Sequence, residues 1–330
     1  MTDKKNIAVL AGGNSSEFFI SLKSAETVAN AIDKEKYNVF VVQIKDKEWT
    51  LTNDLNCGLI IHKNDFSFTD KGQKEKFDII VSAIHGTPGE DGLLQGYFDM
   101  LKIPYVGSGV LASSLTFNKF YCNTFLRNFN IVNIAKSVLV RKNKPFTPEN
   151  IITKTGLPCF VKPNAGGSSF GVTKVKETKD LIPAIENAFK ESEEVIIEEF
   201  IDGSEIQCGI FKTQEKEYKL PLVEIVPKND FFDYQAKYDS NFSEEIIPAR
   251  ISEELTTKCQ EITSQLYNVL NLKGIARMDF ILKNGEFWFL EANTIPGMTA
   301  ESLVPQMIRK SGMTIKEVMT LLIEDTLNKI

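Results

Sequence analysis

The 330-residue sequence contains only two histidines, and its five cysteines never form a Cys-x-x-Cys pair. This scarcity argues against histidine-rich metal centres and excludes zinc fingers, which need closely spaced cysteine and histidine ligands. The cysteines are scattered and odd in number, so they do not form the framework of a disulfide-rich secreted domain. We therefore expect free thiols in a reducing cytoplasm.

Long apolar runs and an excess of basic residues are also missing. No run approaches the roughly 18 residues of a membrane-spanning helix, and the apolar stretch 7–11 is too short for a signal peptide. Lysine and arginine (38) are outnumbered by aspartate and glutamate (44), giving a net charge of −6. A nucleic-acid partner would need a basic face. We expect a cytoplasmic globular protein of two or three domains, with neither a membrane nor a nucleic-acid partner.

The first third of the chain alternates strand-like and helix-like segments. Expected strands cover 7–11, 38–44 and 78–84, and expected helices cover 20–32 and 92–101. A strand, a glycine turn, a helix and another strand in succession predict a parallel α/β sheet.

Further along, shorter strands and helices predict α+β character. Helices are expected at 117–129, from Pro148, at 178–190, at 252–271 and from Thr314, where Glu317 completes a capping box. Strands are expected at 157–161, 172–175, 195–200, 205–211, 219–226, 275–282 and 286–291. We place domain boundaries near 118 and 201, giving segments 1–118, 119–201 and 202–330. The stretch 228–245 lacks periodicity and is long enough to be a functional lid.

One loop has the composition of a phosphate-binding site. Residues 162–171 read Lys-Pro-Asn-Ala-Gly-Gly-Ser-Ser-Phe-Gly. Glycines allow backbone N–H groups to approach a phosphate closely, and hydroxyls and a lysine add donors and charge. A Walker loop would need lysine directly after Gly171, where Val172 stands. A plain hairpin loop is about equally consistent with this segment alone.

A carboxylate-rich pair of strands predicts a metal site. Asp279, Glu291 and Asn293 lie in apolar strands flanking Asn284-Gly285, a hairpin signal. Such oxygen ligands suit Mg²⁺. Side chains alternate along a strand, so a two-residue turn would put Asp279 and Glu291 on opposite faces. We therefore predict a three-residue turn that pairs 282 with 286 and places 277, 279, 289, 291 and 293 on one face. The alternative is an edge hairpin with solvated acids.

Three turns follow expected strands and precede expected helices. The segments are 11–17 (Ala-Gly-Gly-Asn-Ser-Ser-Glu), 85–92 (His-Gly-Thr-Pro-Gly-Glu-Asp-Gly) and 291–303, which contains Pro296-Gly297. Such turns lie at the ligand-facing end of an open sheet. Taken singly, Glu17 is explained as an acid in the first turn of a helix, where its negative charge interacts favourably with the helix dipole. His85 is explained in the same way as a histidine that is hydrogen-bonded to nearby backbone.

Taken together, these segments resemble the D-alanine–D-alanine ligases of the ATP-grasp superfamily. The resemblance spans the whole chain and includes Tyr-x-Ala-Lys-Tyr at 234–238 and Arg-x-Asp-Phe at 277–280. It implies an N-terminal α/β domain that binds substrate and two α+β domains that grip ATP. It also implies formation of D-alanyl-D-alanine through an acyl phosphate for peptidoglycan precursors, two Mg²⁺ ions (or Mn²⁺) and a homodimer.

The resemblance also implies roles for individual residues. ATP would be held by Lys119, Lys162, Gly167, Ser168, Ser169, Glu198, Glu199, Phe200, Ile201, Glu205 and Lys237. The metal ligands would be Asp279, Glu291 and Asn293. The first D-alanine would bind Glu17 and His85, the second Ser302 and Leu303, and the oxyanion Arg277 and the Gly297 amide. Glu17, Ser168 and Tyr238 would form a hydrogen-bonded trio that closes the site.

Four positions depart from the family pattern: Asn118 replaces an aspartate, Phe18-Phe19 a polar pair, and Phe232 a frequent tyrosine. Tyr238 is retained, which in this family accompanies the dipeptide product rather than D-alanyl-D-lactate. The alternatives are a D-lactate-using or other ATP-grasp ligase, and a nucleotide-binding relative without catalysis. Retention of Arg277 and the three metal-ligand positions argues against the non-catalytic alternative.

Overall fold

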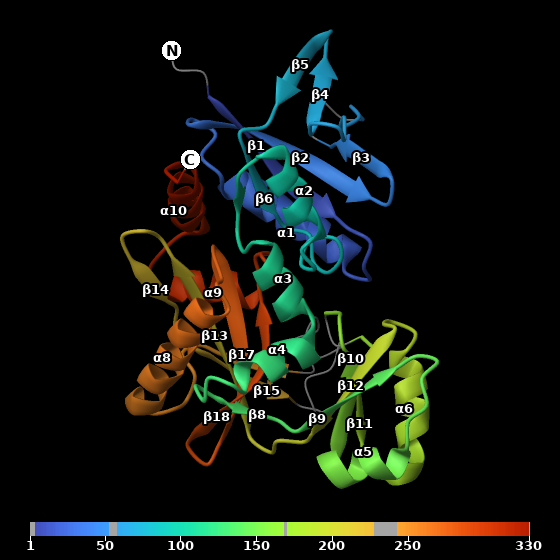
Figure 1. Ribbon diagram of the computed structural model, residues 1–330. Helices are drawn as coiled ribbons and strands as arrows, with labels where there is room; N and C mark the ends of the chain where they lie inside the picture. Colours follow the sequence, from blue (N-terminus) through green and yellow to red (C-terminus); the bar gives the residue numbers. More distant parts are fainter. Residues whose placement is uncertain (1–3, 53–57, 168–169, 228–242, 330) are drawn as a thin grey trace.

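The computed structural model describes residues 4–52, 58–167, 170–227 and 243–329, and its larger sheets are arranged as shown in Figure 1. The first is a five-stranded sheet of order β3-β2-β1-β6-β7. Its strands are β1 (Lys5–Gly12), β2 (Tyr37–Lys45), β3 (Glu48–Leu51), β6 (Ile79–Ser82) and β7 (Tyr105–Val106). Strands β2, β1, β6 and β7 are mutually parallel, as the sequence predicts.

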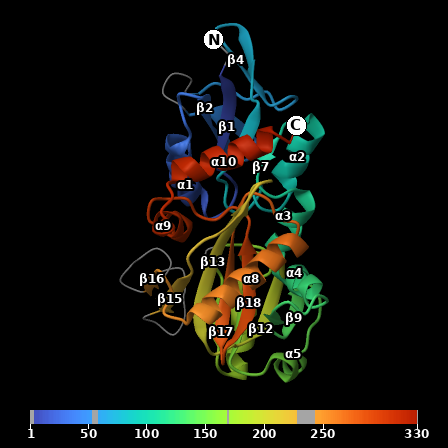
Figure 2. The ribbon, with the colours of Figure 1, turned by 90° about the vertical axis from the view of Figure 1, so that its left-hand side faces the viewer.

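Both faces of this sheet are covered, which explains the uninterrupted apolar run of β1. Helix α1 (Phe18–Ala31) packs on one face together with the C-terminal helix α10 (Ile315–Leu327), and α9 (Leu303–Lys310) joins the same core cluster from the side of the large sheet, where Met307 lies against Gly209. The other face is covered by helix α2 (Leu93–Leu101) and the hairpin of β4 (Ser67–Asp70) and β5 (Gln73–Lys76). Figure 2 shows α10 lying beside α1 and β7, so the end of the chain returns to its beginning.

A four-stranded antiparallel sheet forms the second unit, in the order β11-β10-β12-β9. Its elements are β9 (Ser137–Arg141), α5 (Pro148–Thr155), β10 (Cys159–Pro163), β11 (Thr173–Val175), the 3-10 helix η1 (Thr178–Asp180), α6 (Leu181–Ala188) and β12 (Glu194–Glu199). Helices α5 and α6 contribute Ile151, Leu181 and Ile185 to its core. The predicted start of a helix at Pro148 is confirmed.

The largest sheet has seven strands, with the path β16-β15-β13-β17-β18-β8 and with β14 beside β13. The elements here are α3 (Val110–Phe117), α4 (Lys119–Leu126), β8 (Asn133–Ile134), β13 (Ser204–Lys212), β14 (Glu217–Lys219), β15 (Val223–Pro227), β16 (Ser243–Ile246), α8 (Glu253–Val269), β17 (Ile275–Lys283) and β18 (Glu286–Asn293). The expected strand 219–226 is in fact two strands, and helix α3 was not expected. At α10, Thr314 and Glu317 form both bonds of the predicted capping box.

The turn between β17 and β18 differs from the prediction. Lys283 pairs with Glu286, so the turn has two residues, and Asn284 and Gly285 both have positive φ, as a type I′ turn requires. The three-residue turn is therefore wrong. Instead, a bulge opposite Asp279 and Phe280 leaves Leu290 unpaired, so Glu291 still lies opposite Asp279. Phe289 pairs with Phe280 in the core, so its predicted place on the acidic face is also wrong.

Helix α4 and strand β8 lie between the two proposed domain boundaries but belong with the large sheet. Cys122 and Leu126 of α4 are part of that sheet's core, and β8 pairs in parallel with β18. The boundaries near 118 and 201 stay predictions. The four described cysteines are free and buried, as expected. Within the described residues, no helix is long and apolar enough to cross a membrane.

Candidate active site

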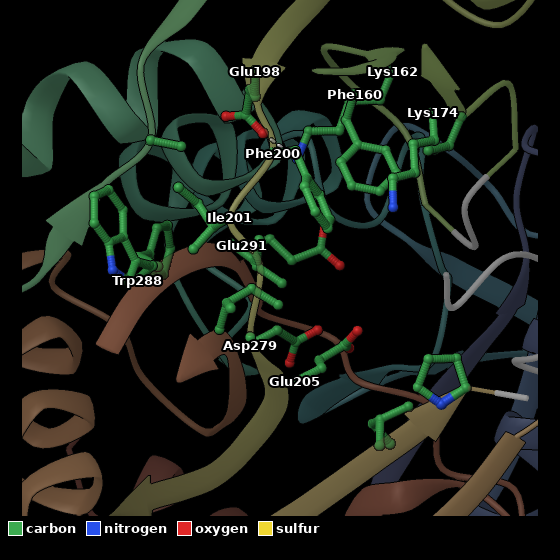
Figure 3. Close-up of a pocket in the computed structure, with 18 of the residues that line it drawn as sticks. Phe160, Lys162, Lys174, Glu198, Phe200, Ile201, Glu205, Asp279, Trp288 and Glu291 are labelled. Atoms are coloured by element: carbon green, nitrogen blue, oxygen red, sulfur yellow. Dashed lines mark ion pairs between the residues drawn. The ribbon is translucent and has the colours of Figure 1, made fainter. Parts of the chain in front are cut away.

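A cavity of about 460 Å³ lies between the four-stranded sheet and the large sheet. Figure 3 shows its lining, with Phe160 and Phe200 near the top of the view, Trp288 at the left, and the carboxylates of Glu205, Asp279 and Glu291 nearer the centre. The predicted nucleotide residues in this lining are Lys119, Lys162, Gly167, Glu198, Glu199, Phe200, Ile201 and Glu205. Chain segments that are far apart in sequence thus meet in one place.

The apolar wall contains residues that sequence reasoning missed. Phe160 and Phe200 have ring centroids 5.8 Å apart, and the Lys174 ammonium lies 3.8 Å from the centroid of the Phe200 ring. Trp288 and Ile281, paired across β17 and β18, also line the cavity. Lys174 could have been noticed in the sequence, because it is a charged residue at the centre of the short strand 173–175. The place of Trp288 beside Ile281 follows from the two-residue turn, which differs from the turn that the sequence analysis predicts.

Lys162 is held by acids in the inner part of the cavity. Its Nζ lies 2.5 Å from Glu198 Oε2, and the amide of Asn123 donates to Glu198 Oε1 at 2.8 Å. Burial by itself lowers the pKa of Lys162, but the attraction and hydrogen bond of Glu198 outweigh it and raise that pKa. The lysine therefore stays cationic, as a phosphate ligand must. Glu199 accepts from the Lys136 N–H at 2.8 Å.

Lys119 lies between the glycine loop and the acidic strands. Its Nζ donates to the Gly166 carbonyl at 2.8 Å and lies 3.2 Å from Glu291 Oε2. The preceding Asn118 caps helix α4 by accepting from the Tyr121 N–H, and it also accepts from the Asn164 amide. Both bonds use Oδ1, so asparagine performs the capping that an aspartate would perform.

The acidic face of β17 and β18 gathers the predicted metal ligands. Arg277 donates two hydrogen bonds of 2.8 Å to Asp279, and Asn293 donates to the same carboxylate at 3.3 Å. Burial lowers the pKa of Arg277, but Asp279 more than compensates and raises it. On β13, Gln207 donates to Glu205 at 2.8 Å.

This donor set fits Mg²⁺ in chemical type. The site offers two carboxylates and one amide oxygen, and Mg²⁺ is usually held by one or two carboxylates, with waters and substrate phosphates as its other ligands. In the described part of the chain, no three histidine, cysteine or carboxylate side chains gather as an all-protein metal cage. The ligand assignment remains a prediction.

The N-terminal turns reach the same region from the five-stranded sheet. Glu17 is buried and approaches the glycine loop so closely that a Cβ added to Gly167 would lie 2.3 Å from Glu17 Oε2. His85 is buried, with Nδ1 3.0 Å from the Ile295 carbonyl oxygen and Nε2 3.0 Å from Ser24 Oγ. Burial lowers the pKa of His85. In the same segment, 85–92, burial and the nearby charge of Glu17 raise the pKa of Glu90 to about 8.

The segment after β18 carries the remaining substrate residues. Ser302 begins helix α9 as its N-cap and Leu303 is the first helical residue. Ser302 Oγ accepts from the Thr299 N–H at 3.1 Å, and it would lie 2.9 Å from a Cβ added to Gly297. The remaining predicted residues, Ser168, Ser169, Lys237 and Tyr238, lie outside the described residues, as does most of the expected lid.

Two sheets closing on a cavity lined by paired lysines and carboxylates are typical of an ATP-grasp fold. Two family models match the chain: "D-ala D-ala ligase N-terminus" over residues 6–108 and "D-ala D-ala ligase C-terminus" over 126–324. A D-alanine–D-alanine ligase of Parabacteroides distasonis is 52% identical over 325 residues, covering 98% of each chain. The chain therefore belongs to the D-alanine–D-alanine ligase family.

Solved structures agree with this assignment. The VanG D-Ala:D-Ser ligase of Enterococcus faecalis has a TM-score of 0.84 at 33% identity, covering 98% of this chain and 99% of that one. A D-alanine–D-alanine ligase of Bacillus anthracis, solved in complex with ATP, has a TM-score of 0.79 at 29% identity, covering 99% and 98%. Both likenesses extend over nearly the whole chain, so they include the three larger sheets.

Gly167→Ala tests the close approach of the glycine loop to Glu17. A methyl group there would lie 2.3 Å from a Glu17 oxygen, so the loop or the carboxylate must move. We expect kcat/KM to fall by about tenfold or more, since small misplacements in an active site are costly. Gly96→Ala is the control, because its Cβ would meet only Val110 at 3.7 Å. Equal activity of the two variants would contradict the arrangement.

The pH dependence of stability tests the burial of His85. Its pKa is lowered in the folded chain, whereas the unfolded value is about 6.5. The unfolded chain therefore binds more protons below about pH 6.5, and stability from this source falls as the pH drops. We expect the stability difference between wild type and His85→Gln, measured as urea midpoints, to shrink from pH 7.5 to 5.5. A difference independent of pH would show that His85 is not held neutral.

Proposed function

We propose that this protein joins two D-alanine molecules into D-alanyl-D-alanine, using ATP and an acyl phosphate intermediate, in the cytoplasmic synthesis of peptidoglycan precursors. The observation that carries the proposal is the convergence of Lys119, Lys162, Asp279 and Glu291 on one cavity beside Glu17. Phosphoryl transfer depends mainly on positioning and on neutralising charge. We also propose that the enzyme acts as a homodimer, as the family resemblance implies.

ATP would occupy the cavity between the two sheets. We assign the adenine to the segment Glu198–Ile201, next to the Phe160 and Phe200 rings, and the ribose to Glu205. The phosphates would then lie toward Lys119 and Lys162, with Lys237 and the loop residues Gly167, Ser168 and Ser169 adding donors. The two described lysines have acid partners at 3.2 and 2.5 Å, so both positive charges are held near the expected phosphates.

Mg²⁺, one or two ions, or Mn²⁺ in its place, would be held by Asp279, Glu291 and Asn293. When bound, it would neutralise phosphate charge and orient the γ-phosphate. These residues lie on neighbouring strands with side chains on one face, at 279, 291 and 293. Their present partners are Arg277 and Lys119, so the protein itself supplies the balancing positive charge at this face.

The reaction has two steps. A carboxylate oxygen of the first D-alanine attacks the γ-phosphorus, and ADP leaves. The free amine of the second D-alanine then attacks the carbonyl carbon of the acyl phosphate, and the resulting tetrahedral intermediate expels phosphate as the amine loses its proton. Arg277 and the Gly297 N–H would stabilise the negative oxygen of that intermediate, which needs a fixed cation and an oriented donor.

The substrates would be held by groups from both ends of the chain. Glu17 would bind the ammonium of the first D-alanine, with His85 close to its carboxylate. Ser302 and Leu303 would hold the second D-alanine at the start of α9. Glu17, Ser168 and Tyr238 would close the site over the substrates.

D-serine is the second candidate for the second substrate, because a D-Ala:D-Ser ligase is a close structural neighbour. D-lactate is disfavoured by the retained Tyr238 at the position that accompanies the dipeptide product in this family. Both alternatives share the first step with the proposed reaction, so only the product distinguishes them.

The activity is tested by phosphate release from ATP and Mg²⁺ with D-alanine, D-serine, D-lactate or no acceptor, together with mass analysis of the product. We expect phosphate release that depends on D-alanine and a product with the mass of D-alanyl-D-alanine. Release without D-alanine, or none at all, would refute the proposal. A mixed product only in the presence of D-serine or D-lactate would redirect it to that substrate.

Arg277→Lys tests the oxyanion role while keeping a positive charge beside Asp279. Lysine lacks the planar fork that makes two bonds to the carboxylate, so we expect kcat to fall by about a hundredfold or more. The Kd for ATP should change by less than about threefold. Arg141→Lys is the matched control, since Arg141 pairs with Glu194 at the surface, away from the cavity. Unchanged turnover in Arg277→Lys would exclude the role.

A further inference from the structure

The turn that presents Gly297 is held from outside by the N-terminal part of the chain. Residues 294–302 belong to no helix or strand, so their position depends on contacts with other elements. Two backbone groups of this turn, the Ile295 carbonyl and the Met298 N–H, bond to His85 and Ser24. His85 follows β6 and Ser24 lies in α1, both elements of the five-stranded unit.

The directions of these hydrogen bonds follow from chemistry. A carbonyl oxygen can only accept, so His85 must carry its proton on Nδ1 to bond to the Ile295 carbonyl at 3.0 Å. In a neutral ring Nε2 is then an acceptor, and Ser24 Oγ donates to it at 3.0 Å. The same Oγ accepts from the Met298 N–H at 3.2 Å. The chain of bonds runs from Met298 through Ser24 and His85 back to Ile295, and every donor and acceptor in it is used.

Protonation of the His85 ring would disrupt this chain of hydrogen bonds. Nε2 would then donate to Ser24 Oγ, which would leave the serine proton without this acceptor in a fully buried position. Burial lowers the pKa of His85 against the attraction of Glu17, while Arg277 also disfavours the cation. The neutral ring is therefore the form that fits its surroundings.

Glu90 holds the same turn from the other side. Its Oε2 accepts from the Gly86 N–H at 2.8 Å and its Oε1 from the Ile295 N–H at 3.4 Å. Both backbone polar groups of Ile295 are thus bonded to side chains of the segment 85–90. The turn before Gly297 has little freedom to rotate its peptide planes.

We propose that Ser24 is a positioning residue for ligation, which orients the Gly297 N–H by holding the adjacent Met298 N–H and the His85 ring together. The inference rests on the proposed function, because it is the oxyanion of that reaction that the Gly297 N–H meets. His85, which lies close to the carboxylate of the first D-alanine in that reaction, takes part in the same hydrogen bonds through both of its ring nitrogens.

Ser21 supplies a matched control on the same helix. Both serines are completely buried. Ser21 Oγ accepts from the Gly12 N–H and donates to the Ala83 carbonyl, both at 2.8 Å. Ser21→Ala and Ser24→Ala therefore each remove one buried hydroxyl with one backbone donor and one acceptor, but only Ser24 touches the Ile295–Met298 turn.

The kinetic arm compares the two variants with wild type. Both should have a lower Tm, since each loses buried hydrogen bonds. Only Ser24→Ala should lose about tenfold or more in kcat for dipeptide formation, with the Kd for ATP unchanged. Equal losses of kcat in the two variants, or full activity of Ser24→Ala, would overturn the inference. If the wild-type protein lacked D-alanine-dependent activity, the proposed function would be overturned. If the wild type is active but the two variants lose kcat equally, only the inference on Ser24 is overturned.

The spectroscopic arm does not depend on activity. The chain has only two histidines, so ¹⁵N spectra of the imidazoles contain two rings, and His62→Gln assigns them. We expect His85 at pH 7.5 to be neutral and protonated at Nδ1. In Ser24→Ala its Nε2 resonance should move downfield as the hydrogen bond is lost, and in Ser21→Ala it should not move. A proton on Nε2 in wild type, or no shift in Ser24→Ala, would overturn the inference.

Discussion

The alternation of side chains along a β-strand is the constraint on which the candidate active site depends. Asp279 lies on β17, and the other proposed metal ligands lie beyond a tight turn on β18. A regular ladder from that turn would place Glu291 opposite residue 278 and turn its carboxylate into the hydrophobic core. One unpaired residue, Leu290, shifts the register so that Glu291 faces Asp279 and Asn293 faces Arg277. The bulge thus allows a stable type I′ turn and an acidic face to coexist in one hairpin.

Paired charges explain how the cavity can be both buried and ionic. Lys162 pairs with Glu198, Lys119 with Glu291, and Arg277 with Asp279. Burying any of these charges alone would be costly, and removal of one partner leaves the other uncompensated. Each pair joins residues from different strands or from a strand and a helix, except for Arg277 and Asp279. Each pair thus lies within one unit, and the two units are joined across the cavity by other bonds, from Lys119 to the Gly166 carbonyl and from Asn123 to Glu198.

The N-terminal unit completes this site rather than standing beside it. Glu17 reaches the glycine loop, and Ser24, His85 and Glu90 hold the segment that leads to Gly297. In the opposite direction, α10 from the end of the chain packs beside α1 and β7 of the N-terminal unit, and α9 lies in the core cluster shared by this unit and the large sheet. Movement of this unit would change the position of substrate-binding and oxyanion-stabilising groups together, because they share hydrogen bonds.

The sequence by itself determined the parallel N-terminal sheet, the helix start at Pro148, the capping box of Thr314 and Glu317, and the chemical types that meet in the cavity, because periodicity, capping and family motifs are local properties. Only the tertiary structure decided the bulge at Leu290, the Phe160–Phe200–Lys174 wall and the Ser24–His85 bonds. These features depend on which strand pairs with which residue and on side chains from distant segments, and local patterns carry little information about either. The departure at Asn118 shows the same limit: its effect became clear once Oδ1 was seen to accept both bonds.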